Sequence, residues 1–271
     1  MRTKYLLLIL LFSIKGFACS CDTPKPAVEF YESAYVFEGQ VIKEKYASDS
    51  LTKTVTFKIS KHYKNGDNPK YLDFKLNSEA EVTGRYSSCY WTANLGEKWL
   101  VYAKKRDGQL KFHFFCSNSE YLDESKISLT EQKVLDNGNK LKLTDYRYQF
   151  FQAKPLTNVD SILKPYKNKR FDPSGFAPFW VDVNENGLLE TVNLSPRRKL
   201  NYEVIDTIFG MNQFKNEYEK PRSNFERVAL KIARKIKEWE KYYYLDLKES
   251  VNYRTYFKLF IDKDSIIQFE K

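Results

Sequence analysis

The residues with the clearest chemistry are four cysteines: Cys19, Cys21, Cys89 and Cys116. An even number of cysteines in an exported protein predicts disulfide bonds, and four cysteines allow three pairings. Cys19 and Cys21 are one residue apart and cannot easily bridge each other, because a disulfide requires a particular separation and direction of the two side chains. We therefore expect Cys19 and Cys21 each to pair with a distant cysteine, which leaves two pairings open.

Other reactive chemistry has no visible basis in the sequence. The only two histidines, His62 and His113, lack ligand spacing relative to the cysteines, and no CxxC pair occurs, so a structural zinc is not favoured. The chain contains no GxSxG, HExxH, Walker or GxGxxG motif. We therefore expect a protein that is not an enzyme and that binds no cofactor.

The first eighteen residues have the layout of a secretory signal peptide. The basic start MRTK precedes an apolar run from Tyr5 to Ile14, and the small residues Gly16 and Ala18 stand before a cleavage point at Cys19. We expect export to a periplasm, a cell surface or the exterior. Lipidation of Cys19, which alone would attach the protein to a membrane, is the alternative. It is disfavoured because Gly16 replaces the usual Leu, Val or Ile, and because it would leave another cysteine unpaired.

Composition indicates a folded protein with a basic surface. Of the 271 residues, 42% are hydrophobic and 16% aromatic, which is enough for real cores. The formal net charge is +10, and such a balance can indicate binding to nucleic acid or to an anionic surface. With an export signal and no nucleic-acid motif, we interpret the charge as a solvated surface and expect no nucleic-acid partner.

The region 19–122 has the pattern of a small β domain. The sequence predicts a short helix over Pro24–Ala34 and five strands, over Tyr35–Lys45, Thr52–His62, Tyr71–Leu76, Lys98–Lys104 and Leu110–Cys116. In the second strand Val55, Phe57 and Ile59 alternate with polar residues, and Asp107-Gly108 is a hairpin signal. Five short strands fit a small closed barrel.

The mature start CSCDTP, then AVEFYESAYVFEGQVIK, then SSCYWTANLGEKWLVYAKKRDGQLKFHFFCS, resembles the netrin-like family, whose best-known members are the tissue inhibitors of metalloproteinases. The resemblance covers about residues 19–120 and implies an OB-type barrel with the bonds Cys19–Cys89 and Cys21–Cys116. The third bridge of the animal inhibitors has no counterpart here, and Cys89-Tyr90 stands where the family commonly has Cys-Gly.

Two functions follow from the resemblance. As an inhibitor, the protein would chelate the catalytic zinc of a metalloprotease through the free amine and carbonyl of Cys19. Ser20 would enter the specificity pocket, and a ridge of Cys21, Asp22, Ser87, Ser88 and Tyr90 would contact the protease. As a non-inhibitory protein-binding module, it would use Cys19 and Cys21 only to tie its N-terminus to the barrel. We favour the binding module, because a fold does not determine a function.

The remainder of the chain predicts a connector and a second domain. Residues 123–172 contain one candidate helix, Ser125–Leu135, and are otherwise polar. In residues 173–271 a hairpin around Asn184–Gly187 is followed by a helix whose apolar face runs from Phe225 to Trp239, and then by a strand. WVDVNENGLLETVNLS and KIKEWEKYYY resemble the C-terminal domain of TonB, although the proline after the tryptophan is missing and 196–222 is a long insertion.

Taken together, the sequence predicts a mainly β fold with helices. An N-terminal five-stranded OB-type barrel would be followed by a C-terminal α+β domain. The TonB-like resemblance implies a protein partner in the cell envelope, docked by strand addition, and the netrin-like resemblance implies a metalloprotease as the other candidate partner.

Overall fold

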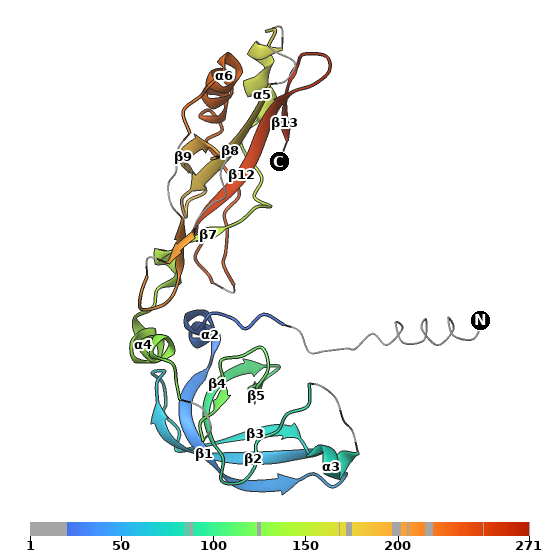
Figure 1. The fold of residues 1–271 in the computed structure, drawn as a ribbon, viewed down its shortest axis with the longest axis vertical. Helices are drawn as coiled ribbons and strands as arrows, with labels where there is room; N and C mark the ends of the chain where they lie inside the picture. The colour runs from blue at the N-terminus through green and yellow to red at the C-terminus, as the bar shows by residue number, and fades with distance from the viewer. Residues whose placement is uncertain are drawn as a thin grey trace, which may run out of the picture. The chain divides into compact units, whose positions relative to one another are not determined.

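The structure is a computed structural model of the chain. It describes residues 21–84, 86, 89–123, 126–167, 169–171, 175–196, 202–204, 206–214, 219–245 and 247–270. The fold is mainly β with helices, and it divides into two compact units (Figure 1). Unit 1 extends to Leu141 and includes Thr207–Gly210, whereas unit 2 comprises Lys142–Asp206 and the chain from Met211 onward. The division therefore falls inside residues 123–172, which were predicted to form a connector.

Unit 1 is built on one antiparallel sheet. Its strands are β1 (Tyr35–Tyr46), β2 (Thr52–His62), β3 (Tyr71–Asn77), β4 (Lys98–Arg106), β5 (Gln109–Lys111) and β6 (Glu120–Tyr121). The order along the sheet is β3-β2-β1-β4-β5, and β6 pairs with β4 beyond the end of β5. The end strands β3 and β5 contact each other. No hydrogen-bonded ladder among the described residues joins them, so the sheet is not closed into a barrel.

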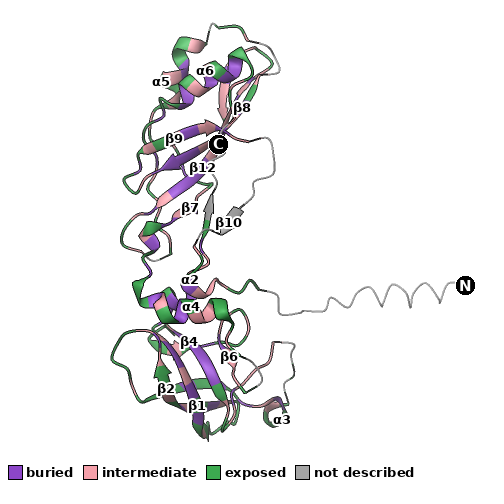
Figure 2. Ribbon diagram, turned by 60° about the vertical axis from the view of Figure 1, so that its left-hand side comes forward, coloured by how far each residue is buried: buried purple, intermediate pink, exposed green. Residues whose placement is uncertain are grey.

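The alternation in β2 explains the core of unit 1. Val55 and Phe57 are fully buried, whereas Thr54 and Lys58 point outward, as the period of a strand requires. Phe57 packs edge-on against Phe74 and Phe112, with ring centroids 5.6 and 5.7 Å away. Figure 2 shows the buried residues concentrated along the inner strands of the sheet. This aromatic core is the platform from which the loops of unit 1 project.

Two helices lie together beside this sheet. Helix α2 (Pro26–Glu32) begins with proline at its first position and buries Ala27, Val28 and Phe30. Helix α4 (Leu129–Asn137) contacts α2. It begins four residues later than the predicted Ser125, which lies outside the described residues. Ser128 sets this start, because its side chain accepts a 3.1 Å hydrogen bond from the backbone N–H of Glu131.

The predicted strand Leu110–Cys116 is wrong beyond Lys111, where β5 ends. Residues 112–119 instead follow a turning path, and Cys116 has a left-handed backbone with φ of 58°. The chain turns here because Cys116 is disulfide-bonded and because Ser117 and Asn118 bond to Glu29. Local alternation of aromatic residues therefore mispredicted a segment whose path is set by long-range contacts.

Unit 2 contains a second sheet with a helix on one face. Its strands are β7 (Arg147–Gln149), β8 (Phe176–Val183), β9 (Leu189–Leu194), β12 (Asn252–Ile261) and β13 (Ile267–Glu270). The order is β13-β12-β8-β9, and β7 pairs parallel to β12. Helix α6 (Asn224–Ala233) packs on β8 and β9, burying Phe225, Ala229 and Ile232 (Figure 1).

The predicted hairpin of unit 2 forms, but the helix is shorter than its apolar pattern suggested. Asn184–Gly187 make the turn between β8 and β9. Helix α6 ends at Ala233, and Trp239 lies beyond it in an extended segment. The backbone N–H of Trp239 donates to the carbonyl of Gly187 at 2.8 Å, and Leu189 donates to Lys237. Pairing with the hairpin therefore ends the helical path, while Trp239 remains the buried core residue that was expected.

The segments between these elements also carry structure. Helix α5 (Val159–Leu163) lies in the predicted connector, and the short strands β10 (Tyr202–Val204) and β11 (Asn212–Phe214) pair within the predicted insertion. None of the helices in the described ranges is long and apolar enough to cross a membrane.

Candidate functional site

Of the two predicted disulfide bonds, Cys21–Cys116 is confirmed, with its Cα atoms 5.5 Å apart. Cys89 is also disulfide-bonded. Its predicted partner Cys19 lies outside the described residues, so the Cys19–Cys89 pairing stays a prediction. Ser20, Ser87 and Ser88 of the predicted ridge also lie outside them, whereas Asp22 is exposed and Tyr90 is half-buried.

Polar contacts hold the segment after Cys21 against the turn that follows Cys116. The carboxylate of Glu29, which is only 2% exposed, accepts from the Ser117 hydroxyl at 2.8 Å and from the Asn118 backbone N–H at 2.7 Å. The Asn118 side chain donates to the same carboxylate and to the carbonyl of Pro24. A carboxylate this buried requires such donors. The disulfide and this network together fix the position of the described N-terminal segment.

A groove of about 310 Å³ opens beside Cys89. It lies between the end of β3, helix α3 (Ala80–Thr83) and the Cys89 turn, and we call it the Cys89 groove. Its lining comprises Leu51, Asn77, Ser78, Thr83 and Tyr86, together with Cys89 and Tyr90. Tyr86 is 74% exposed and Leu51 is 38% exposed. Of the predicted ridge residues that the structure describes, Tyr90 lines this groove, whereas Cys21 and Asp22 do not.

Hydrogen bonds to backbone carbonyls connect the segments that line this groove. The hydroxyl of Tyr90 donates to the carbonyl of Ser78 at 3.0 Å, and the backbone N–H of Ser78 donates to Leu51 at 3.1 Å. The hydroxyl of Thr92 donates to the carbonyl of Asn77 at 3.1 Å. These contacts tie the loop after β1, the end of β3 and the Cys89 turn into one surface.

A buried lysine fixes helix α3 next to the groove. The Lys53 ammonium group, whose side chain is 0% exposed, donates to Glu44 at 2.9 Å, to Asn94 at 3.1 Å and to Glu79. Glu79 is the residue directly before α3, and its other carboxylate oxygen accepts from the Tyr46 hydroxyl at 2.8 Å. A lysine can be buried in this way only because carboxylates compensate its charge.

These contacts set the electrostatics around the groove. Burial acts to raise the pKa of Glu79, but hydrogen bonds led by that from Lys53 lower it below its ordinary value. The pKa of Tyr46 is raised to about 12, first by its hydrogen bond to Glu79. The pKa of Tyr90 is raised by burial and then by the negative charges of Glu79 and Glu81. The negative charges of Glu79 and Glu81 therefore act on the Tyr90 hydroxyl, although the Glu79 carboxylate is also paired with Lys53.

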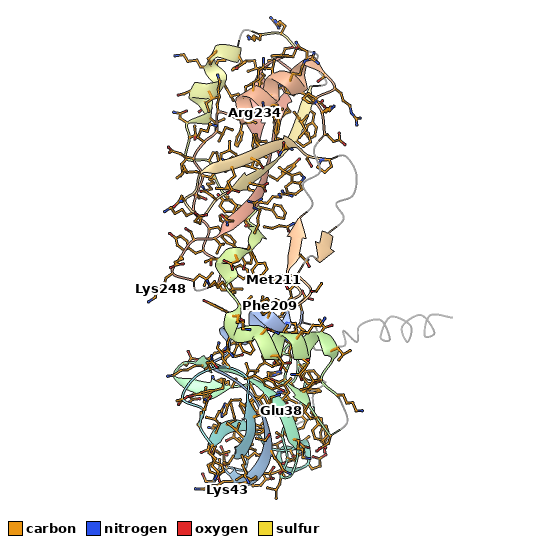
Figure 3. The ribbon with its side chains drawn as sticks, turned by 90° about the vertical axis from the view of Figure 1, so that its left-hand side faces the viewer. Glu38, Lys43, Phe209, Met211, Arg234 and Lys248 are labelled. Carbon is orange, nitrogen blue, oxygen red and sulfur yellow. A yellow bond between two sulfur atoms is a disulfide. The ribbon has the colours of Figure 1, made fainter. Side chains whose placement is uncertain are left out.

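Unit 2 contains a second hollow of about 430 Å³. Its charged lining residues are Glu185, Glu249, Lys241 and Lys248, the last of which is labelled in Figure 3. The balanced charges and the exposed position give it no evident chemical preference. The two histidines are engaged by backbone carbonyls, His62 by Pro69 and His113 by Phe115. Across the described ranges, no cluster of three or more His, Cys, Asp or Glu side chains could hold a metal ion.

Comparison of the chain with protein-family models gives no match, and comparison with curated proteins gives no significantly similar sequence. The site is therefore defined by its geometry. The sequence analysis singled out Cys89 and Tyr90 but missed Leu51, Ser78 and the buried Lys53. The signal for Lys53 was present, because it lies two residues before Val55 and four before Phe57 and so shares their inward face.

Proposed function

We propose that the protein is an exported, disulfide-stapled, non-catalytic protein-binding module, and that the Cys89 groove is its contact surface. The observation that carries this proposal is the concentration of exposed apolar side chains at a cleft of side-chain size. Tyr86, Val82 and Leu51 are 74%, 50% and 38% exposed, and Tyr86 and Leu51 line the groove. Exposed aromatic and aliphatic side chains around a cavity are typical of protein-binding surfaces.

The fold of unit 1 is compatible with this proposal. A five-stranded OB-type barrel is partly open, and the contact between β3 and β5 in an otherwise open sheet has that character. With the Cys21–Cys116 bond, it supports a netrin-like module. In unit 2, a hairpin, a helix on one sheet face and the long strand β12 support the TonB-like resemblance, and with it a partner in the cell envelope.

Site-specific photocrosslinking tests the contact surface. A photoreactive phenylalanine in place of Tyr86 should form a crosslink to a partner protein in the cells that produce the chain. The same group in place of Tyr243, which is 50% exposed in unit 2, should give no such product. Adding Leu51→Asp should remove the Tyr86 crosslink while the disulfides still form. Equal crosslinking from both positions, or a product unaffected by Leu51→Asp, would contradict the proposal.

Metalloprotease inhibition is the second candidate, and the fixed position of the N-terminal segment favours it. Cys21–Cys116 and the bond from Asn118 to the Pro24 carbonyl hold the chain immediately after Cys19 and Ser20. Zinc chelation needs a free α-amino group on Cys19, whose ordinary pKa of about 7.7–8.0 leaves a neutral fraction at pH 7. Mass spectrometry of the mature protein and titration of a metalloprotease panel test this. An added N-terminal alanine should abolish any inhibition that occurs.

A further inference from the structure

Helix α6 of unit 2 presents a row of positive charges to solvent. Arg227 and Lys231 lie on the helix four residues apart, and Arg234 and Lys235 continue the series in the turn directly after it. Residues at this spacing lie on one side of a helix. All four side chains are exposed, and none forms an ion pair with another described residue. Because the opposite side of α6 is buried against β8 and β9, this row is the face that the helix presents outward.

The chain after α5 adds a further cation beside this row. The short 3₁₀ helix η3 (Lys164–Tyr166) follows α5, and Figure 1 and Figure 2 both show α5 next to α6. The ammonium group of Lys169 lies 5.0 Å from the centre of the Tyr166 ring, and that of Lys235 lies 5.7 Å from it. Lys169 is exposed and has no ion pair within the described part of the chain. We call Arg227, Lys231, Arg234, Lys235 and Lys169 the basic surface of unit 2.

The stability of the helix does not explain the basic surface. Like charges three or four residues apart repel each other and weaken a helix. Acidic residues offset them little, since Glu226, the one acidic residue of α6, is only 5% exposed, and Asp160 and Glu238 are the exposed acidic residues of the adjoining segments. The sequence analysis interpreted the net charge of +10 as a solvated surface, but part of that charge is concentrated here. An anion held against this surface would relieve the repulsion.

The surroundings favour an anionic membrane over a nucleic acid. Single-stranded nucleic acids stack their bases on aromatic rings, but the Tyr166 ring is half-buried and already has two ammonium groups near it. Exposed leucines lie next to the row instead. Leu156 is 64% exposed, and its backbone N–H donates to the carbonyl of Glu238 at 2.8 Å, while Leu188 is 47% exposed and pairs with the same residue. Leucines beside cations suit the boundary between lipid headgroups and acyl chains.

We infer that the basic surface of unit 2 binds the headgroups of anionic lipids at a membrane surface. The ammonium and guanidinium groups lie against the lipid phosphates, and Leu156 and Leu188 contact the layer beneath them. The contact is peripheral, because the apolar face of α6 is buried in the core of unit 2 and cannot insert. It attaches the protein without a lipid, whereas the sequence analysis expected attachment only through lipidation of Cys19. It concerns unit 2 and does not depend on the Cys89 groove.

Co-sedimentation of the mature protein with lipid vesicles tests the inference. The anionic vesicles contain equimolar phosphatidylcholine and phosphatidylglycerol, and vesicles of pure phosphatidylcholine are the neutral control. The protein should sediment with the anionic vesicles at about 0.1 M salt and stay in solution with the neutral ones. Raising the salt to about 1 M should release it, because the Debye length then falls from about 10 Å to about 3 Å.

A double variant and a matched control assign the contact to this surface. Each Lys or Arg near an anionic bilayer strengthens binding about fivefold, so Lys231→Gln combined with Arg234→Gln should weaken it about 25-fold. Lys43→Gln combined with Lys58→Gln makes the same change of charge at exposed positions of unit 1 and should leave binding nearly unchanged (Figure 3 labels Arg234 and Lys43). Equal binding to the two kinds of vesicle, or equal weakening by the two double variants, would overturn the inference. Binding to a DNA duplex but not to vesicles, lost in the Lys231 and Arg234 variant, would assign the surface to nucleic acid instead.

Discussion

The buried Lys53 provides the sharpest test of how the groove is held in place. In Lys53→Met the side chain keeps its length and apolar packing, but Glu44 and Glu79 lose their cation. Removing one partner of a buried ion pair costs about 3–5 kcal/mol when the remaining charge is fully desolvated. Here the two carboxylate side chains remain 18% and 23% exposed, so water compensates part of the loss. We therefore expect the free energy of unfolding of unit 1 to fall by about 2–3 kcal/mol.

Hydrogen–deuterium exchange read by mass spectrometry measures this change within the full chain. Each 1.4 kcal/mol changes an equilibrium tenfold, so protection of β1 and β2 peptides should fall roughly 30- to 150-fold. Peptides of β8 and β12 in unit 2 serve as the internal reference. The control is Lys58→Met, since Lys58 lies on the same strand, is exposed and has no ion pair in the described residues. An exposed substitution of this kind should change stability by less than about 0.5 kcal/mol.

The free energy of unfolding should also depend on pH differently in this variant, and the lowered pKa of Glu79 determines the direction of that difference. The pKa of Glu79 is lowered in the folded protein, so its stabilising contribution is present above its unfolded pKa. That contribution is lost as the pH falls below about 4.5 and through the lower folded value. Lys53→Met should flatten this acid dependence. The reasoning is refuted if Lys53→Met and Lys58→Met agree within about 0.5 kcal/mol, or if the double variant with Glu79→Gln costs the full sum of its single changes.

Three further substitutions test other parts of the structure. Burial and then the nearby acidic charges raise the pKa of Glu131 from 4.5 to about 7, so folding becomes less favourable as the pH rises between these values. Glu131 is only partly buried, so solvent screening reduces the effect of this shift on stability. Glu131→Gln should therefore stabilise unit 1 by only about 1–2 kcal/mol at pH 8 and by almost nothing at pH 4, as measured by chemical denaturation. Arg254→Met should destabilise unit 2 by about 2 kcal/mol, because it breaks the bidentate pair with the 2%-exposed Asp182, while Arg147 still pairs with that carboxylate at 3.2 Å. Exchange protection of β8 that stays at its original level would contradict this expectation. Gly187→Ala should lower the free energy of unfolding by at least about 2 kcal/mol, because φ is +80° and a Cβ atom would lie 2.6 Å from the Trp239 carbonyl oxygen. Its control is Gly108→Ala, which has a similar φ of +76° but free space around the new Cβ atom, and which should lower stability clearly less.

Local patterns predicted the elements of this fold where local chemistry decides them. The alternation Val55-Phe57-Ile59 located β2, and the turn Asn184–Gly187 located the β8–β9 hairpin, because period and turn chemistry are properties of a few neighbouring residues. The Cys21–Cys116 bond was predicted from the family resemblance and is present in the structure. Spacing alone had left two pairings open, since both Cys19 and Cys21 could reach a distant partner.

The errors occur where distant contacts override the local pattern. The apolar face of α6 continues to Ile236 and Trp239 at helical spacing, yet the helix ends at Ala233. The backbone around Trp239 pairs instead with the β8–β9 turn, and the sequence of residues 234–239 does not predict this pairing. The aromatic run after β5 likewise alternates like a strand, but Cys116 must turn to meet Cys21.

The Cys89 groove shows why a binding site of this kind escapes sequence analysis. Its lining residues come from the loop after β1, the end of β3, helix α3 and the Cys89 turn, and only the folded chain brings these segments together. Lys53, in contrast, could be predicted, because the alternation places it on the inward face of β2. A lysine buried there requires carboxylates nearby to compensate its charge. Glu79 pairs with Lys53 and directly precedes α3, so this ion pair also holds the helix whose Thr83 lines the groove. Lys53→Met should therefore weaken the photocrosslink from position 86 as well as lowering stability, even though Lys53 does not line the groove.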